Sequence, residues 1–276
     1  LQQVVKNVVS KLDNAYEHKA MLLPMIPRTL NLDSMNLSQL SLHKVCVGYR
    51  KETIEPFYMD LQRNFGTLIM ANKKSLLTEY CRVFYKELEY IANDDVARVY
   101  LFDIDNLFKS ERYTNIKYVY DEEINNTMNN LSIYIKGEVE KYNSLENKAE
   151  YKAPRRSLLV FHNVSAIFKS LEDKIKSEFS DLVEQARELG LFDFVLCDIV
   201  SDYKDVYRDK GLQKILMDSN GILIGNSYDN QLYIEMNTRD IRVRDNVLDK
   251  LGYIVDNGKG YYAQVLQYTE EEEEEE

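Results

Sequence analysis

The sequence predicts an α/β fold, in which a mainly parallel β-sheet is sandwiched by helices. Short apolar runs, such as residues 157–163 and 192–199, alternate along the chain with longer segments whose apolar residues recur every three or four positions. Continuous apolar runs of this length are typical of strands buried on both faces, and the periodic segments are typical of amphipathic helices. Because strands and helices alternate, neighbouring strands are expected to be parallel and joined by right-handed crossovers.

The first part of the chain is predicted to form a helix, an extended strap and two short strands. Residues 1–16 place valine and leucine side chains on one helical stripe, and residues 21–32 contain two prolines and no periodicity. This strap is expected to lie over apolar surface. Residues 44–49 and 56–61 are short runs separated by a polar turn, which predicts a pair of strands.

The alternating part of the chain supplies most of the sheet and its covering helices. The predicted strands are residues 64–71, 97–105, 116–120, 157–163, 192–199 and 221–226. The predicted helices are residues 75–91, 121–142 and 164–189. The third helix has the most regular apolar stripe, and Gly190 follows it as a typical C-terminal cap. Short antiparallel strands are expected to complete the chain, the last of them at residues 261–268.

Length, composition and charge limit the classes of protein. The 276 residues fit one domain, residues 1–268, followed by an acidic disordered tail, residues 269–276. The tail ends in seven consecutive glutamates, so the net charge of −11 becomes about −4 without them. A domain with this balance lacks the basic surface that nucleic-acid binding requires. No apolar run approaches the roughly 20 residues that span a bilayer. The start at Leu1 rather than Met suggests a piece of a longer protein.

Cysteines and histidines show no spacing that is typical of a metal site. Cys46, Cys81 and Cys197 are widely separated and lie in apolar runs, which predicts buried free thiols of a reducing compartment. The three histidines are scattered, and no metal-ligand spacing links them to the cysteines. No bound metal is therefore expected.

The first strand-to-helix junction, IMANKKSLL, resembles a damaged phosphate-binding loop. A working P-loop reads G-x-x-x-x-G-K-[ST], and its glycines let backbone N–H groups surround the phosphates. Lys74 and Ser75 occupy the places of the Lys and Ser/Thr. Without a gap, Leu68 and Lys73 occupy the two glycine positions, and a shortened loop is the alternative. In both cases the cradle is damaged, and Asn72 is the residue that tolerates a left-handed conformation at low cost. Asn72 to Ser75 are thus a degenerate nucleotide-binding candidate.

The second junction, LLVFHN, lacks the acids that hydrolysis of a nucleotide requires. A hydrolytic site needs an Asp here as a partner of the metal, usually followed by an acid that activates water. The chain has His162 and Asn163 instead. Neutral His is a poor Mg²⁺ ligand, and Asn cannot accept a proton from water. No catalytic residue is therefore predicted.

Each candidate also has a structural interpretation. Lys73 and Lys74 fit a solvated helix start as well as residual anion binding by a helix N-terminus. His162 fits an ordinary hydrogen-bonded histidine at the end of a strand. Asp103 and Asp105 form a possible carboxylate pair, although acids are common at strand ends.

The order of these landmarks resembles the FtsK/SpoIIIE-type ATPase domains, which have a RecA-like P-loop NTPase fold. The landmarks are LLPMIP, VCVGY, PFYMDL, NFGTLIMANKKS, YLFDID and LLVFHN, and the resemblance covers residues 1–268. It is greatest to the last ATPase domain of the membrane-anchored coupling ATPase of type VII secretion in Firmicutes. Within the family's motifs only Lys74 and Ser75 match, and His162 and Asn163 fall where the acidic pair would be.

The resemblance implies a degenerate ATPase module in the cytoplasmic part of a bacterial cell-membrane protein. Its implied role is substrate recognition and assembly in a hexameric secretion motor. The implied partners are secreted WXG-type and other type VII substrates and the other ATPase modules of the same chain, with no nucleic acid. No cofactor is expected beyond weak ATP binding. Two alternatives are an ATPase completed by a neighbouring module or subunit and a DNA-translocating motor, the latter disfavoured by the acidic composition.

Overall fold

The computed structural model describes most of the predicted domain. The described residues are 30–268 apart from 33–34, 93–97, 219, 240–242 and 244–246. The predicted helix at residues 1–16, all of the strap before residue 30 and the acidic tail lie outside the described residues. No helix within the described part is long and apolar enough to cross a membrane.

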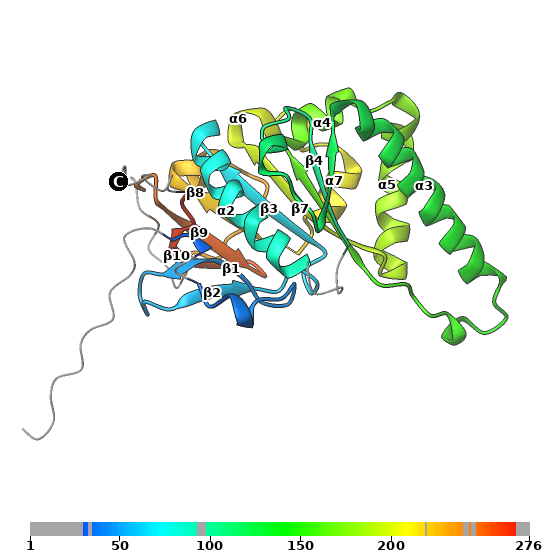
Figure 1. The fold of residues 1–276 in the computed structure, drawn as a ribbon, viewed down its shortest axis with the longest axis horizontal. Coiled ribbons are helices and arrows are strands. Elements are labelled where there is room, and N and C mark those ends of the chain that lie inside the picture. Colours follow the sequence, from blue (N-terminus) through cyan, green and yellow to red (C-terminus); the bar gives the residue numbers. More distant parts are fainter. Residues whose placement is uncertain are drawn as a thin grey trace, which may run out of the picture.

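One ten-stranded sheet organises the fold, with the strand order β2-β1-β10-β9-β8-β3-β7-β6-β4-β5 (Figure 1). The strands are β1 (Val45–Arg50), β2 (Pro56–Met59), β3 (Gly66–Ala71), β4 (Arg98–Asp103), β5 (Ile116–Tyr120), β6 (Ser157–His162), β7 (Phe192–Ile199), β8 (Gly221–Ile224), β9 (Leu251–Asp256) and β10 (Lys259–Val265). The six strands from β8 to β5 are parallel, and β2, β1, β10 and β9 are added antiparallel. The predicted mainly parallel sheet with a short antiparallel end is confirmed.

Helices cover both faces of this sheet. The helices are α2 (Lys74–Ala92), α3 (Asp121–Ser144), α4 (Val164–Ser170), α5 (Asp173–Leu189), α6 (Val200–Tyr203) and α7 (Lys210–Ile215). The apolar side of α2 packs in one core together with the antiparallel strands, whereas α3, α4, α5 and α7 pack in a second core. Figure 1 shows α2 over the centre of the sheet and α3 and α5 together at the far end from β1, β2 and β10.

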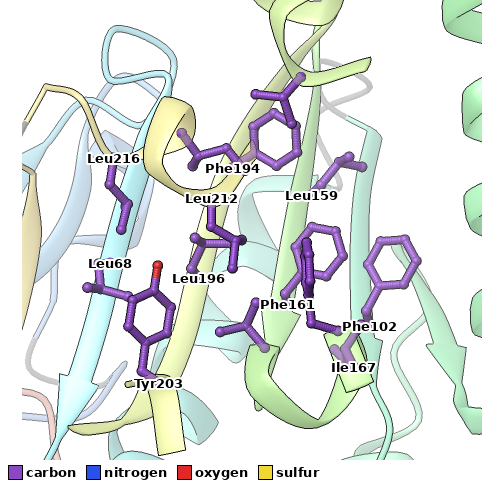
Figure 2. Packing of buried hydrophobic residues seen from close by; sticks show 14 of the residues in the cluster. Leu68, Phe102, Leu159, Phe161, Ile167, Phe194, Leu196, Tyr203, Leu212 and Leu216 are labelled. Atoms are coloured by element: carbon purple, nitrogen blue, oxygen red, sulfur yellow. The ribbon is translucent and has the colours of Figure 1, made fainter. Parts of the chain in front are cut away.

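The two cores follow from the alternation of side chains along the buried strands. In β3, Leu68 and Met70 point into the core under α4, α5 and α7, whereas Ile69 and Ala71 point into the core under α2. All four are 0% exposed. Figure 2 shows the first of these cores, in which Leu68 lies beside Leu196 and Tyr203.

The order of the strands places the candidate junctions close together. From β3 the chain passes through α2 to β4, returns through β6 to β7, and then crosses to β8 on the other side of β3. Strand β7 therefore lies between β3 and β6. Ligands of open α/β sheets bind beyond the carboxyl ends of the strands at such a change of direction. The carboxyl ends of β3, β4 and β6 are therefore the expected place of a ligand site.

The helix predicted over residues 164–189 is wrong in one respect, because the structure has two helices, α4 and α5. Leu171 and Glu172 take extended conformations between them. Asn125 of α3 stabilises the break: its Nδ2 donates to the carbonyl of Ser170 at 3.1 Å, and its Oδ1 accepts from the N–H of Glu172 at 2.9 Å. The apolar stripe continues across the break, so periodicity alone could not reveal it.

Replacing Asn125 with alanine is expected to lower the free energy of unfolding by about 1–3 kcal/mol, since two hydrogen bonds at about 0.5–1.5 kcal/mol each are lost. The exposed neighbour Asn126 offers a matched control, and Asn126→Ala should change stability by less than about 0.5 kcal/mol. Urea unfolding of both variants measures the difference. Equal stabilities of the two variants would show that Asn125 does not hold the break.

Several predicted strands are longer than the observed ones: β2 ends at Met59 rather than at residue 61, β3 begins at Gly66 rather than at residue 64, and β6 ends at His162 rather than at residue 163. Two further differences lie near the first strand-to-helix junction. Strand β4 ends at Asp103 rather than at Asp105, and β8 ends at Ile224 rather than at residue 226. In the second case Gly225 has a φ of +62°, a left-handed conformation that ends the strand and starts a 3₁₀ turn, η5 (Gly225–Asn230). Both ends turn toward the first strand-to-helix junction.

Candidate functional site

The connection between β3 and α2 consists of only two residues. Strand β3 ends at Ala71 and α2 begins at Lys74, so Asn72 and Lys73 form the whole connection. Leu68 lies in the middle of β3 and is 0% exposed, which excludes it from any loop. Of the two alignments to a P-loop, the shortened loop is therefore the correct one. Two residues without a glycine cannot surround a phosphate with backbone N–H groups in the way that a P-loop does.

Lys74 forms a three-residue network with Asp105 and Asn163. The Nζ of Lys74 lies 2.9 Å from Oδ2 of Asp105, and Nδ2 of Asn163 donates to the same oxygen at 2.9 Å. The Lys74 and Asp105 side chains are 58% and 31% exposed. Thus residues that follow β3, β4 and β6 meet at one carboxylate, on the edge of the sheet where a ligand would bind.

The network fixes the charge of Asp105. Partial burial raises the pKa of this carboxyl, but hydrogen bonds from Lys74 and Asn163, together with the charge of Lys74, lower it below its ordinary value of 3.8. Asp105 is therefore ionised at neutral pH and neutralises Lys74. The lysine that resembles the phosphate-binding lysine already has an anionic partner.

The second lysine and the asparagine of the connection contact C-terminal segments. Lys73 Nζ lies 2.8 Å from Oδ2 of Asp249, and both side chains are more than half exposed. Gly225 lies so close to Asn72 that a Cβ at this position would be 3.1 Å from Oδ1 of the asparagine. Ser75 is exposed at the start of α2. These contacts place the turn after β8 and the segment before β9 against the connection.

His162 and Asn163, adjacent in sequence, point in different directions. His162 is 1% exposed, and its Nδ1 lies 3.0 Å from the hydroxyl of Tyr85 on α2. Asn163 takes a left-handed conformation, with a φ of +59°, and its Oδ1 accepts from the N–H of Ala166 to cap α4. The structure thus brings Asn163 together with Lys74, whereas His162 points into the core.

Asp103 and Asp105 do not form a carboxylate pair. Asp103 is fully buried, and its Oδ2 accepts from the backbone N–H of Phe108 at 2.9 Å and from the hydroxyl of Tyr118 at 2.7 Å. Asp105 lies in the turn beyond β4 and faces Lys74. The first carboxylate organises the β4 turn, and the second belongs to the site.

A buried acid that the sequence reasoning missed lies at the end of β7. Asp198 is 1% exposed and accepts hydrogen bonds from the N–H and hydroxyl of Ser165 and from the N–H of Ile199. Burial raises its pKa to about 6, against the lowering effect of these hydrogen bonds. The carboxylate joins the first turn of α4 to β7. Its position after an apolar strand, in FVLCDI, was the available signal.

A second cluster that sequence spacing concealed lies next to His162. The three cysteines are buried free thiols, as predicted. Two of them, Cys81 on α2 and Cys197 on β7, meet His162 so closely that one ligand atom of each lies within 4.8 Å of the others. Two cysteines and one histidine that are far apart in the sequence are therefore brought together in space.

The geometry at the carboxyl ends of β3, β4 and β6 defines the class of fold. A strand, a short connection and a helix that begins with Lys-Ser, followed by parallel strands on both sides of β3, form a P-loop ATPase fold. The edge of the sheet at these strand ends carries two lysines, each paired with an aspartate.

Solved structures of secretion ATPases share this fold. The cytoplasmic domain of EssC superposes with a TM-score of 0.68 at 17% identity, over 96% of this chain and 53% of that one. EssC ATPases 2 and 3 from Geobacillus thermodenitrificans give 0.69 at 16%, over 96% and 50%. Thermomonospora curvata EccC ATPases 2 and 3, in complex with a signal sequence peptide, give 0.65 at 15%, over 96% and 48%.

The similarity defines the fold of this chain rather than its activity. This chain spans about half the length of the EssC and EccC chains that it matches. No family model and no curated protein matches the sequence.

Proposed function

We propose that the chain is a degenerate ATPase module of a type VII secretion motor, in the cytoplasmic part of a membrane protein, and that it acts in substrate recognition and assembly rather than in ATP hydrolysis. The similarity to EssC and EccC over 96% of the chain supports the assignment to a secretion motor. The same similarity supports other ATPase modules as neighbours, since two of the matched structures contain ATPases 2 and 3.

The observation that carries this proposal is the two-residue connection between β3 and α2. It has neither the length nor the glycines of a phosphate cradle, and its lysines are paired with Asp249 and Asp105. The two residues at the end of β6, where the family has its acidic pair, are not acids: His162 is buried and Asn163 caps α4. Phosphate binding and activation of water are therefore both impaired.

The surface of a module that does not hydrolyse ATP can still serve in recognition. A module without turnover still contributes surface to a motor, and an EccC structure of the same fold is in complex with a signal sequence peptide. We infer that this chain binds secreted substrates, among them helical WXG-type proteins. The proposed contact surfaces are the strap at residues 21–26, which lies outside the described residues, and the surface around residues 72–75.

The alternative is a nucleotide-binding or conditionally active ATPase module, completed by a neighbouring module or subunit. One observation favours it. The Lys74–Asp105 ion pair is partly exposed, and exposed ion pairs contribute only about 0–1 kcal/mol. A phosphate could therefore displace Asp105 at small cost, provided that another subunit supplies the missing acid.

Titration of the purified chain tests the recognition role. We expect a WXG-type substrate, alone or as its preformed complex, to bind with micromolar affinity, as is typical of transient contacts. We expect millimolar Mg·ATP to leave the melting temperature unchanged within about 1 °C, because stabilisation by a ligand scales with occupancy. A rise of several degrees that Lys74→Ala abolishes would favour the alternative, and failure to bind any substrate would remove the recognition role.

A further inference from the structure

We propose that Cys81, His162 and Cys197 form a zinc site in the core beneath α2. The three residues come from α2, β6 and β7, and all are at most 1% exposed. His162 and Cys197 are Cα partners in the β6–β7 ladder, and Cys81 reaches them from the helix above. His162 of this site directly precedes Asn163, which belongs to the edge formed by Lys74, Asp105 and Asn163.

The spacing of the ligand atoms suits a small ion. For three atoms that lie within 4.8 Å of one another, some point in their plane is no more than about 2.8 Å from each, and zinc bonds measure about 2.3 Å to sulfur and about 2.0–2.1 Å to nitrogen. Each ligand atom therefore needs to move by less than about 1 Å.

The donor set selects the metal. Two thiolates and an imidazole are soft or intermediate ligands, which favour Zn²⁺ or Cu⁺ over Mg²⁺ and Ca²⁺. With both cysteines ionised, Zn²⁺ gives a cluster without net charge, whereas Cu⁺ leaves one uncompensated negative charge. Because charge in a low-dielectric core is costly, the neutral zinc cluster is favoured.

The surroundings supply the hydrogen bonds that such a site needs. The Tyr85 hydroxyl donates to Sγ of Cys197 at 3.4 Å and lies 3.0 Å from Nδ1 of His162. Hydrogen bonds of this kind orient metal ligands and stabilise thiolates. Phe108 packs edge-on against the His162 ring, with centroids 4.8 Å apart, and limits its rotation.

A buried acceptor without a hydrogen-bond partner in the described part of the chain lies on the strand next to His162. Asp103 is the Cα partner of His162 in the β4–β6 ladder and is 0% exposed. Its Oδ1 is buried and has no hydrogen-bond partner among the residues that the structure describes. Such an orphaned oxygen is destabilising in an apolar core.

The test measures zinc on the full chain, purified under reducing conditions. Elemental analysis is expected to find one zinc per chain. Cys81→Ala and Cys197→Ala are expected to reduce it to near zero, whereas Cys46→Ala, at a cysteine that is 1% exposed but outside the cluster, keeps it. Tyr85→Phe is expected to weaken zinc binding about 10–100-fold, as is usual when a group that hydrogen-bonds a ligand is removed.

Cobalt substitution covers the case in which a cysteine variant does not fold. Co²⁺ added to the metal-free wild-type chain is expected to give the thiolate-to-cobalt charge-transfer band of a site with cysteine ligands. Absence of this band, a Cys81–Cys197 disulfide in the purified chain, or equal zinc contents in all three cysteine variants would overturn the proposal.

Discussion

The variant Glu87→Gln is expected to be more stable than the wild-type chain at pH 8 by a few kcal/mol. Glu87 lies on α2 and is 0% exposed. Its Oε1 accepts from the N–H of Cys46 at 2.6 Å, whereas Oε2 is buried and has no hydrogen-bond partner among the described residues. Burial raises the pKa of this carboxyl to about 8, and the hydrogen bond from Cys46 lowers it only in part.

The sign of the pH dependence follows from the raised pKa. Below the unfolded pKa, near 4.5, Glu87 is protonated in both states. Between about pH 4.5 and 8 the unfolded chain loses the proton and the folded chain keeps it, so the contribution of Glu87 to stability falls as pH rises. At about 1.36 kcal/mol per pKa unit the full loss is up to about 5 kcal/mol. Glutamine keeps the acceptor for Cys46 and cannot ionise.

Urea unfolding from pH 4.5 to 8.5 measures this difference. The gain of Glu87→Gln over wild type is expected to be near zero at the acidic end and largest above pH 8. Glu79 on the same helix is exposed, so Glu79→Gln is the control and should follow the wild-type curve. A constant difference across the pH range would show that Glu87 does not carry a raised pKa.

Replacing Phe161 with alanine is expected to lower the free energy of unfolding by about 3–5 kcal/mol, the usual cost of a large cavity in a core. Phe161 is 1% exposed and stacks on Phe102 of β4, with ring centroids 4.7 Å apart and nearly parallel planes. Phe194, on the neighbouring strand β7, also stacks with Phe161, with ring centroids 6.4 Å apart. Figure 2 shows Phe161 in the middle of the core, beside Phe102.

The same change should disturb the candidate site, because His162 and Asn163 directly follow Phe161. Phe161→Leu retains most of the volume and is expected to cost less than about 1.5 kcal/mol. Thermal and urea unfolding measure the loss in the free energy of unfolding for each of the two variants. A loss of less than about 1 kcal/mol for Phe161→Ala would mean that the aromatic stack is not a principal part of the core.

The sheet could be predicted from the sequence because its strands are buried on both faces. Such strands appear as continuous apolar runs, and two of them, β5 and β7, have the predicted bounds. The break between α4 and α5 could not be predicted, because its cause is Asn125 on a helix almost fifty residues away. The apolar stripe on either side of Leu171 carries no trace of that contact.

The position of the candidate site could be predicted from the sequence, but the side-chain contacts within it could not. Lys74, Ser75, His162 and Asn163 stand at strand ends, and a parallel sheet brings such ends to one edge. The end of β3 at residue 71 was predicted and is confirmed, although the sequence left open whether the P-loop is shortened. The pairing of Lys74 with Asp105 and the meeting of the cysteines with His162 depend on long-range packing, which residue spacing does not encode.

The central claim is that the edge formed by Lys74, Asp105 and Asn163 does not turn over ATP. The most direct test is Mg·ATP hydrolysis by the purified chain, measured beside Lys74→Ala and beside buffer alone. The account predicts that neither protein exceeds the background rate and that the two do not differ. A wild-type rate near about 1 s⁻¹, the low end of typical enzymes, that Lys74→Ala abolishes would contradict it.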